Sequence, residues 1–218
     1  MQKKFLLSIF SVLMIFCLTA CGSEAEKPKF SADKSILGWA EMDAFGNSAN
    51  IAATGMDKAQ QEQLSNAVVK GTTELLTAFP VSDVCLDKFA KDYFSQLPAK
   101  MNISTKIKKD DAEHPVVEVT ANVIDVSKVN DIASKSENLA QITLAMEQLH
   151  EKGVTDEQIK NDAEFQQELA ATFVKYLDEM PLIQKTYDVT CKIAQGEDGN
   201  LYYVPEDGDA LKKFLGGL

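Results

Sequence analysis

The residues best suited to metal binding or acid–base chemistry in this chain are few and stand apart. The 218 residues include only two histidines, His114 and His150. His114 stands in a polar turn before Pro115, and His150 stands near the end of a helical segment, where a cation suits the helix dipole. Neither belongs to a metal-type pattern such as H-E-x-x-H or C-x-x-C, and no phosphate-binding or nucleophile-elbow motif occurs. We therefore expect no metal site, no cofactor and no catalytic residues of these classes.

Two acidic turns superficially resemble calcium-binding loops. They are E-D-G-N at 197–200 and P-E-D-G-D at 205–209. Neither has the regularly spaced oxygen ligands of an EF-hand loop. Glycine and aspartate in these orders are typical of a hairpin turn and of a helix N-cap, and we expect those two roles.

Asp125 is a carboxylate whose position in the sequence allows a catalytic role. It has the same strand parity as Val119 and Val123, so in a regular strand its side chain would point toward the core. A carboxylate in an apolar cone between a helix and a sheet can act as a general base. The alternative is that Asp125 caps the helix that begins near Ser127, because aspartate is common just before a helix.

Three aromatic residues could line a ligand site or anchor the core. They are Trp39, which is the single tryptophan, and the neighbours Tyr202 and Tyr203. We expect a packing role, because large aromatic side chains usually belong to one contiguous core.

An apolar run that ends at a cysteine dominates the N-terminus. Two lysines precede the run, whose length fits the h-region of a signal peptide and falls short of the ~20 residues that span a bilayer. It ends in Leu-Thr-Ala-Cys at 18–21, which resembles the lipobox of bacterial lipoproteins. This resemblance implies cleavage before Cys21 and a diacylglyceryl group on its thiol, whereas Cys17 does not fit because Phe16 precedes it. The alternative is an ordinary secretory signal with a chance cysteine.

The lipobox resemblance divides the chain into three parts. Residues 1–20 would be the signal peptide, 21–29 a lipidated polar tether, and 30–218 a single extracytoplasmic domain. Acyl chains such as palmitate on Cys21 would anchor the protein in the cell membrane, facing outside the cytoplasm, because two or three chains hold stably where one holds weakly. At ~3.3 Å per residue, the tether after Cys21 would reach roughly 26 Å from the membrane surface.

The charge of the chain argues against nucleic acid as a partner. The formal net charge is −11, from 33 acidic and 22 basic residues, and every basic residue is lysine. No basic patch is visible, and an acidic domain is repelled by anionic lipid, so the acyl chains must hold it at the membrane. Bidentate clamping of phosphate or carboxylate is a property of arginine, so the absence of arginine makes ligands of those classes less expected. The alternative, which we favour, is that the absence of arginine reflects a nucleotide-composition bias of the source genome.

Helical spacing and cap signals predict the helical parts of the chain. In 82–97, apolar residues recur every four positions and Pro98 is expected to end the helix. Thr155 and Gln158 match a capping box. The predicted helices are 31–46, 57–79, 82–97, 127–151, 155–180 and 209–215.

Strict alternation of apolar and polar residues predicts two β-hairpins. The first pairs 101–107 with 117–123 around a polar turn, and the second pairs 187–193 with 201–204. Antiparallel hairpins packed against several helices form an α+β domain. Over about 82–218, and most suggestively over the C-terminal YDVTCKIAQGEDGNLYYVPEDGDALKKFLGGL, this pattern resembles NTF2-like or cystatin-like extracytoplasmic domains of uncharacterised Gram-positive lipoproteins. The resemblance implies no catalytic residues.

Cys85 and Cys191 are the cysteines of the expected mature domain that are not lipidated. Each falls on the apolar side of its predicted element, so a shared core could bring the two thiols together. Outside the cytoplasm a disulfide would persist, provided that the two Cα atoms lie within about 7 Å. The alternative is two separate buried thiols, because free cysteine packs as a small hydrophobe.

The sequence thus predicts a membrane-anchored binding or accessory module without enzymatic activity. Its ligand would be a small molecule, a wall polymer or a protein, and the sequence does not choose among them. The alternative is an NTF2-like enzyme that uses Asp125 as a general base in an apolar cone.

Overall fold

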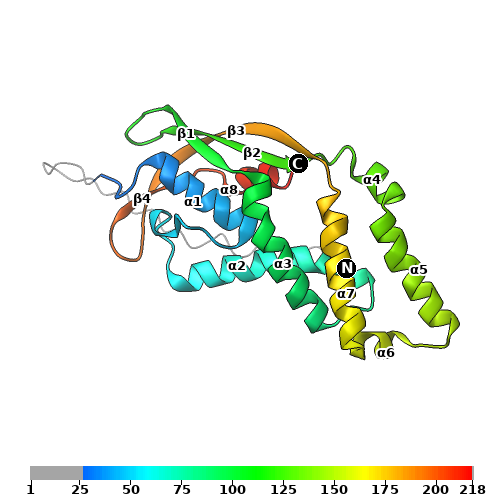
Figure 1. Cartoon of the computed structure of the whole chain (residues 1–218). Helices are drawn as coiled ribbons and strands as arrows, with labels where there is room; N and C mark the ends of the chain where they lie inside the picture. Colours follow the sequence, from blue (N-terminus) through cyan, green and yellow to red (C-terminus); the bar gives the residue numbers. More distant parts are fainter. Residues whose placement is uncertain (1–26, 218) are drawn as a thin grey trace, which may run out of the picture.

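A four-stranded antiparallel sheet in the order β1-β2-β3-β4 forms one layer of the fold, and helices cover one of its faces (Figure 1). This computed structural model describes residues 27–217; the proposed signal peptide, Cys21 and the tether up to residue 26 lie outside the described residues. The strands are β1 Ser104–Lys109, β2 Val116–Ile124, β3 Leu182–Gln195 and β4 Leu201–Pro205. The predicted α+β class with two hairpins is confirmed.

Eight α-helices occur in the described part of the chain. They are α1 Ala32–Phe45, α2 Lys58–Thr73, α3 Asp83–Met101, α4 Val129–Lys135, α5 Glu137–Glu151, α6 Asp156–Asn161, α7 Ala163–Asp178 and α8 Gly208–Leu215. Two short 3-10 helices, η1 Ile51–Ala53 and η2 Glu74–Ala78, flank α2.

The sheet has one apolar face and one polar face. On β2, Val117, Val119 and Val123 are fully buried, and α1, α3 and α8 pack against this strand. On the opposite face, the Lys108 ammonium lies 2.6 Å from an Asp188 carboxylate oxygen and 3.9 Å from one of Glu118. The period of two in the sequence therefore corresponds to a half-buried sheet. We call the cluster around the inner face, with α1 and α8, the sheet core.

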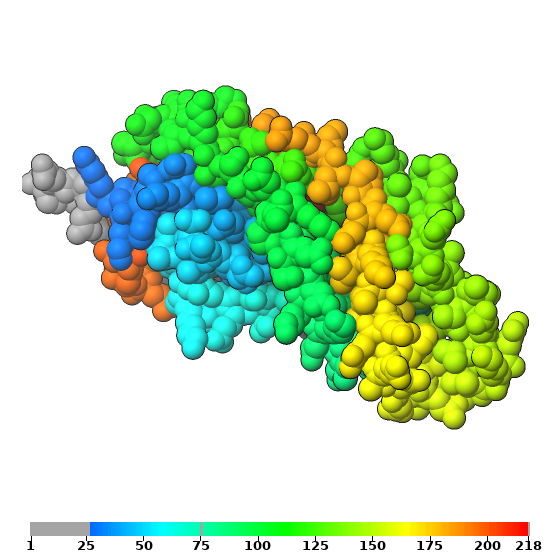
Figure 2. All heavy atoms as spheres, viewed as in Figure 1, coloured from blue at the N-terminus to red at the C-terminus, as the bar shows by residue number. Residues whose placement is uncertain are grey.

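A second hydrophobic cluster lies among the helices, and we call it the helical core. It holds Phe89 of α3, Ile142 of α5, Ile159 of α6 and Phe173 of α7. In Figure 2 the segments from α5 to α7 form a lobe at one end of the molecule, with residues 27–30 at the other. The longest helix, α3, runs from one core to the other, and Tyr93 packs against both.

Buried Gln166 of α7 ties the helical core together through three hydrogen bonds. Its Oε1 accepts from the Ser82 backbone N–H at 2.7 Å, and its Nε2 donates to the Pro80 and Ile159 carbonyls at 3.0 Å each. Because the Gln166 side chain is fully buried, these three bonds replace the hydrogen bonds to water that it loses on folding. They also hold the start of α3 against α6 and α7.

Helix ends follow the cap signals more closely than the predicted ranges. Asp57 and Thr155 each form a capping box, and Gly46 ends α1 with φ +69°. The predicted helix 127–151 is instead two helices, because the Ser136 hydroxyl accepts from Leu139 N–H and starts α5. The predicted helix 155–180 is divided in the same way by Asp162, which caps α7 through the Phe165 N–H.

Two other predicted boundaries were wrong. Pro98 does not end α3, because proline removes only its own N–H while its carbonyl still accepts from Asn102 at 3.1 Å. The helix ends at Asn102, whose φ is +45°, so Met101 is helical and β1 begins at Ser104. Strand β3 begins at Leu182, five residues earlier than predicted, because β2 pairs with it along its whole length.

The aromatic candidates Trp39, Tyr202 and Tyr203 pack as expected. Trp39 and Tyr203 lie against the sheet core. The Tyr202 ring stacks on Phe30, and its hydroxyl donates to Asp198 at 2.7 Å. Tyr202 also lies so close to Gly55 that a Cβ built there would be 2.5 Å from the ring.

Replacing Gly55 with alanine should therefore destabilise the fold more than the same change at Gly153. Both glycines have a positive φ, +72° and +79°, but no atom lies within 4 Å of a Cβ built at Gly153. Gly153→Ala should cost about 1–2 kcal/mol of unfolding free energy for the left-handed backbone, and Gly55→Ala a further ~1–3 kcal/mol for the steric contact. Urea denaturation measures both, and equal losses would contradict the packing of Tyr202 on Gly55.

Candidate functional site

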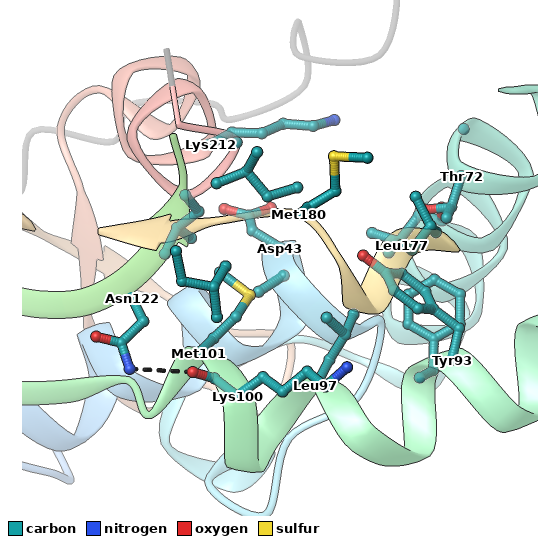
Figure 3. Close-up of a pocket in the computed structure, with 18 of the residues that line it drawn as sticks. Asp43, Thr72, Tyr93, Leu97, Lys100, Met101, Asn122, Leu177, Met180 and Lys212 are labelled. Atoms are coloured by element: carbon teal, nitrogen blue, oxygen red, sulfur yellow. Dashed lines mark hydrogen bonds between the residues drawn. The ribbon is translucent and has the colours of Figure 1, made fainter. Parts of the chain in front are cut away.

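A cavity of about 430 Å³ lies between the helices and the end of the sheet (Figure 3). A volume of this size is typical of sites that enclose a small molecule. Its lining comes from five helices, the ends of β2 and β3, and Met180 between α7 and β3. The lining residues are Asp43, Ala44, Ala67, Val68, Gly71, Thr72, Tyr93, Phe94, Leu97, Lys100, Met101, Asn122, Ile124, Leu177, Asp178, Met180, Leu182, Lys212, Leu215 and Gly216.

The cavity lies where the two cores meet. Leu97 and Met101 belong to the sheet core, and Leu177 packs against the helical core. Tyr93 contacts both, and its ring packs against the rings of Phe89 and Phe94 at centroid distances of 5.4 and 5.6 Å. Most of the lining is therefore aliphatic or aromatic, and an apolar ligand there would gain contacts with both cores.

Asp43 is the carboxyl group that the fold places among these apolar residues. In α1 it follows Ile36 and Ala40 at spacings of seven and three, so it lies on the helix face that those two fully buried residues direct into the protein. No described residue gives its carboxyl group a hydrogen bond or an ion pair. In Figure 3 Asp43 lies amid apolar side chains, with Lys212 extending along the edge of the group.

Burial raises the pKa of Asp43 to about 7, from an ordinary value of 3.8. Desolvation is the largest cause, because a carboxylate loses its hydration when it is surrounded by apolar groups. The positive charge of Lys212 lowers the pKa, and the negative charge of Asp209 raises it. Asp43 therefore exchanges its proton near neutral pH, which suits it to hold a polar group of a ligand or to transfer a proton.

The other charged groups of the cavity are exposed or paired. Lys100, at the end of α3, forms an ion pair with Asp178 at the end of α7, and this pair links the two helices. The Lys100 carbonyl accepts from the Asn122 amide at 3.0 Å, as the dashed line in Figure 3 shows. Lys212 of α8 is exposed. Burial and the negative charge of Asp178 raise the pKa of Tyr93, so its hydroxyl stays protonated.

Helix α2 forms one wall of the cavity and is loosely packed. None of its residues is buried, although it contributes Ala67, Val68, Gly71 and Thr72 to the lining. A helix of this kind is held by few apolar contacts, and such elements open locally at low free energy. Part of the apolar surface of α2 is therefore available to a ligand.

Asp125 does not line the cavity, and the hypothesis that it is a base in an apolar cone was wrong. It follows the last residue of β2, and its Oδ1 accepts from the Ser127 hydroxyl at 2.6 Å and from the Ser127 N–H at 3.2 Å. Its Oδ2 lies 3.4 Å from the Lys128 ammonium. The hydrogen bond from Ser127 is the main cause that lowers the pKa of Asp125, with Lys128 adding to it. Strand β2 ends at Ile124, so the alternation of side chains along the strand does not extend to Asp125. Asp125 instead stabilises the turn that leads into α4.

The histidines and acidic turns have structural partners. His114 Nδ1 lies 2.9 Å from Glu206, and His150 Nε2 lies 2.9 Å from Asp156. Asp198 holds the β3–β4 turn, and Asp207 caps α8 by accepting from the Ala210 N–H at 2.9 Å, as predicted for a hairpin turn and an N-cap. Within residues 27–217, no group of three metal-binding side chains comes together.

Cys85 and Cys191 are both free and buried, so the structure does not contain the disulfide that the sequence allowed. Cys85 belongs to the helical core and Cys191 to the sheet core. Both do lie on apolar faces, but those faces belong to different cores. Burial raises the pKa of the Cys85 thiol to about 11 and that of Cys191 to about 12, which makes both thiols unreactive in the folded state.

Sequence reasoning missed Asp43, although a signal was present. An acid stands at i+7 from Ile36 and i+3 from Ala40, on the apolar side of a helix. Such a mismatch between residue type and helix face is a sequence-level sign of a buried charge. The predicted helix range 31–46 agrees with α1 to within one residue at each end.

Comparisons with known proteins do not give the chain a family. No family model matches it, and no curated protein matches it. Among solved structures it is similar to ycdA from Bacillus subtilis subsp. subtilis str. 168, described as a candidate lipoprotein, with 15% identity and a TM-score of 0.49. The match covers 84% of this chain and 54% of that one, so this chain spans about half the length of ycdA. A likeness this weak transfers no function.

Replacing Asp43 with asparagine should stabilise the protein at neutral and alkaline pH. Because the folded-state pKa of Asp43 is raised to about 7, its ionisation adds no cost below about pH 4; the cost grows between about pH 4 and pH 7 and is constant above that. The unfolding free energy of Asp43→Asn should match that of the wild type near pH 4 and exceed it by roughly 2–4 kcal/mol near pH 8.

Asp125→Asn is the control with the opposite sign. The folded-state pKa of Asp125 is lowered, so its contribution is present at neutral pH and is lost as the pH falls below the unfolded value. Denaturation curves across this pH range measure both variants. If Asp43→Asn and the wild type lose stability in parallel from pH 4 to 8, the Asp43 carboxyl is not desolvated.

Proposed function

We propose that this chain is an extracytoplasmic lipoprotein whose folded domain binds a small, largely apolar ligand in the cavity. The observation that carries the binding role is a partly open cavity of about 430 Å³, lined mostly by apolar residues and containing the Asp43 carboxyl group, which has no hydrogen-bond or ion-pair partner among the described residues. Apolar side chains that line an open cavity are exposed to water, which is unfavourable. A ligand that covers them would gain this free energy.

The membrane location rests on the residues at the N-terminus. The Leu-Thr-Ala-Cys pattern at 18–21 and the apolar run before it support a lipid anchor on Cys21. None of the helices described in residues 27–217 is both long and apolar enough to cross a bilayer. The expected domain boundaries, a signal peptide at 1–20, a tether at 21–29 and one domain from residue 30, are part of this proposal.

The start of the folded part indicates which end of the domain would face the membrane. The Lys29 N–H donates to the Leu201 carbonyl at 2.9 Å, and Phe30 stacks on Tyr202, so the tether emerges beside the β3–β4 hairpin. The lobe of α5 to α7 lies at the other end (Figure 2). In an anchored molecule the hairpin would lie near the bilayer, and the helical lobe would project away from it.

Loose packing of α2 supports ligand entry from that side. The Val68 side chain is only partly buried, and a Cβ built at Gly71 meets no atom within 4 Å. Movement of α2 would therefore open the cavity at the expense of contacts with α1 and α3 that involve no buried α2 residue. A ligand that fills the cavity would in turn bury the inner side of α2.

A second candidate function is an enzyme in which Asp43, rather than Asp125, acts as a general acid or base. It is favoured by the pKa of about 7 that burial gives to Asp43, because catalytic carboxyl groups are tuned in the same way. Recovery of bound compounds distinguishes the two functions. A binding module returns its ligand unchanged, whereas an enzyme returns a product, and Asp43→Asn would abolish that conversion.

Replacing Cys21 with serine should remove the anchor. The hydroxyl cannot form the thioether to diacylglycerol, so the variant should stay unprocessed or leave the membrane. Cell fractionation and the mass of the mature N-terminus measure this. Cys17→Ser is the matched control and should be processed normally. Membrane retention and normal cleavage of the Cys21→Ser variant would exclude the lipoprotein assignment.

A side chain that fills the cavity should block ligand binding. Gly71→Phe adds bulk at a lining position where a Cβ has free space, and it replaces a poor helix former. The neutral probe octanol should bind the wild type and slow hydrogen exchange in α2, whereas Gly71→Phe should weaken binding by about tenfold or more, which is ~1.4 kcal/mol.

Gln63→Phe places the same bulk on an exposed α2 position outside the cavity and should leave octanol binding unchanged. The measurements use the full chain held in an amphipathic polymer, so that no detergent competes. Equal binding to wild type, Gly71→Phe and Gln63→Phe would place the probe elsewhere and contradict the proposed site.

A further inference from the structure

We propose that the cavity selects ligands that join an apolar body to a cationic amine, with the ammonium group paired to the Asp43 carboxylate. This inference rests on the proposed function, because it names the class of ligand for the same cavity. The body would occupy the space between the two cores. The head group would provide the partner that Asp43 does not have among the described residues.

The first step concerns the lack of a partner for Asp43. A carboxylate that is largely removed from water and unpaired is costly, whereas the same carboxylate with a hydrogen-bonded cation is not. The other acid that lines the cavity, Asp178, already pairs with Lys100. An ammonium group that enters the cavity therefore finds one carboxylate without a cation, that of Asp43.

The second step concerns the charges that face Asp43 from the surrounding helices. From α8, Lys212 and Asp209 act on it with opposite signs. Lys100 of α3 and Asp178 of α7 line the cavity as an ion pair. The Tyr93 hydroxyl of α3, which stays protonated, also lines it. The α2 residues that line it are Ala67, Val68, Gly71 and Thr72, which carry no charge. Among residues 27–217, no element places a cation within ion-pair distance of Asp43.

The third step compares the ammonium group with other ligand head groups as a partner for Asp43. A ligand carboxylate that reached Asp43 would place two acids together, which raises the energy of both ionised forms. A neutral hydroxyl could form one hydrogen bond with Asp43 but would bring no opposite charge. An anionic head could avoid Asp43 only by staying at the exposed Lys212, which would leave Asp43 unpaired beside the apolar body.

Proton exchange at Asp43 gives this pairing a measurable signature. The pKa of Asp43 is about 7, so below neutral pH the ammonium must displace a proton from it. Amine binding should therefore tighten as the pH rises from about 6 to 8, while binding of a neutral alcohol should not change through this group. Binding of a carboxylate should weaken over the same range.

The experiment compares octylamine, octanol and octanoate by calorimetry on the full chain in an amphipathic polymer. These probes share a chain length and differ in the head group. We expect octylamine to bind at least about tenfold tighter than octanol near pH 8. In Asp43→Asn the advantage of octylamine over octanol and its pH dependence should disappear. Asp87→Asn, which neutralises an exposed acid of α3 outside the cavity, should behave as the wild type.

Several outcomes would overturn the inference, and they differ from failure of the proposed function. If the three probes bind equally well, or if Asp43→Asn keeps the full preference for octylamine, the cavity binds apolar molecules without selecting an amine. If octanoate binds most tightly and Lys212→Gln weakens it, the head group is anionic. If none of the probes binds the wild type, both the inference and the proposed function fail.

Discussion

The fold depends on the packing of one long helix, α3, into two hydrophobic cores. Its C-terminal half contributes Leu97 and Met101 to the sheet core, and its N-terminal half contributes Cys85 and Phe89 to the helical core. Tyr93 joins them at the middle of the helix. Near the midpoint of α3, α1 packs on the side of the sheet core and α7 on the side of the helical core. The cavity is the space that this arrangement leaves.

Polar contacts keep the two cores in a fixed relation. Gln166 donates both of its amide hydrogens to backbone carbonyls and accepts from one backbone N–H, and it secures the start of α3. At the far end of the same helix, Lys100 pairs with Asp178, and its carbonyl accepts from Asn122 of the sheet. The helix is thus fixed at both ends, so the loosely packed wall of the cavity is α2 rather than α3.

Asp43 shows how the same arrangement could serve a ligand at a cost in stability. A protein selected for stability alone would place an apolar residue at this position of α1, because the surrounding groups are mostly apolar and no cation of the described residues contacts the carboxyl. A buried group of this kind is more easily explained by binding or catalysis than by folding. Asp125, in contrast, has partners for its carboxylate, because Ser127 donates hydrogen bonds to it and the Lys128 ammonium lies close to it within the same turn.

The sequence by itself determined the α+β class, both hairpins and most helix ends, because these follow from local periodicity and from caps such as Asp57 and Thr155. It did not show that 127–151 and 155–180 are each divided, because apolar spacing continues across Ser136 and Asp162. Only the tertiary structure decided which apolar faces meet. Cys85 and Cys191 both lie on such faces, yet they belong to different cores, and Asp43 rather than Asp125 lines the cavity. A helix or strand pattern gives the direction of a side chain relative to its own element, whereas a site requires contacts between elements far apart in the chain.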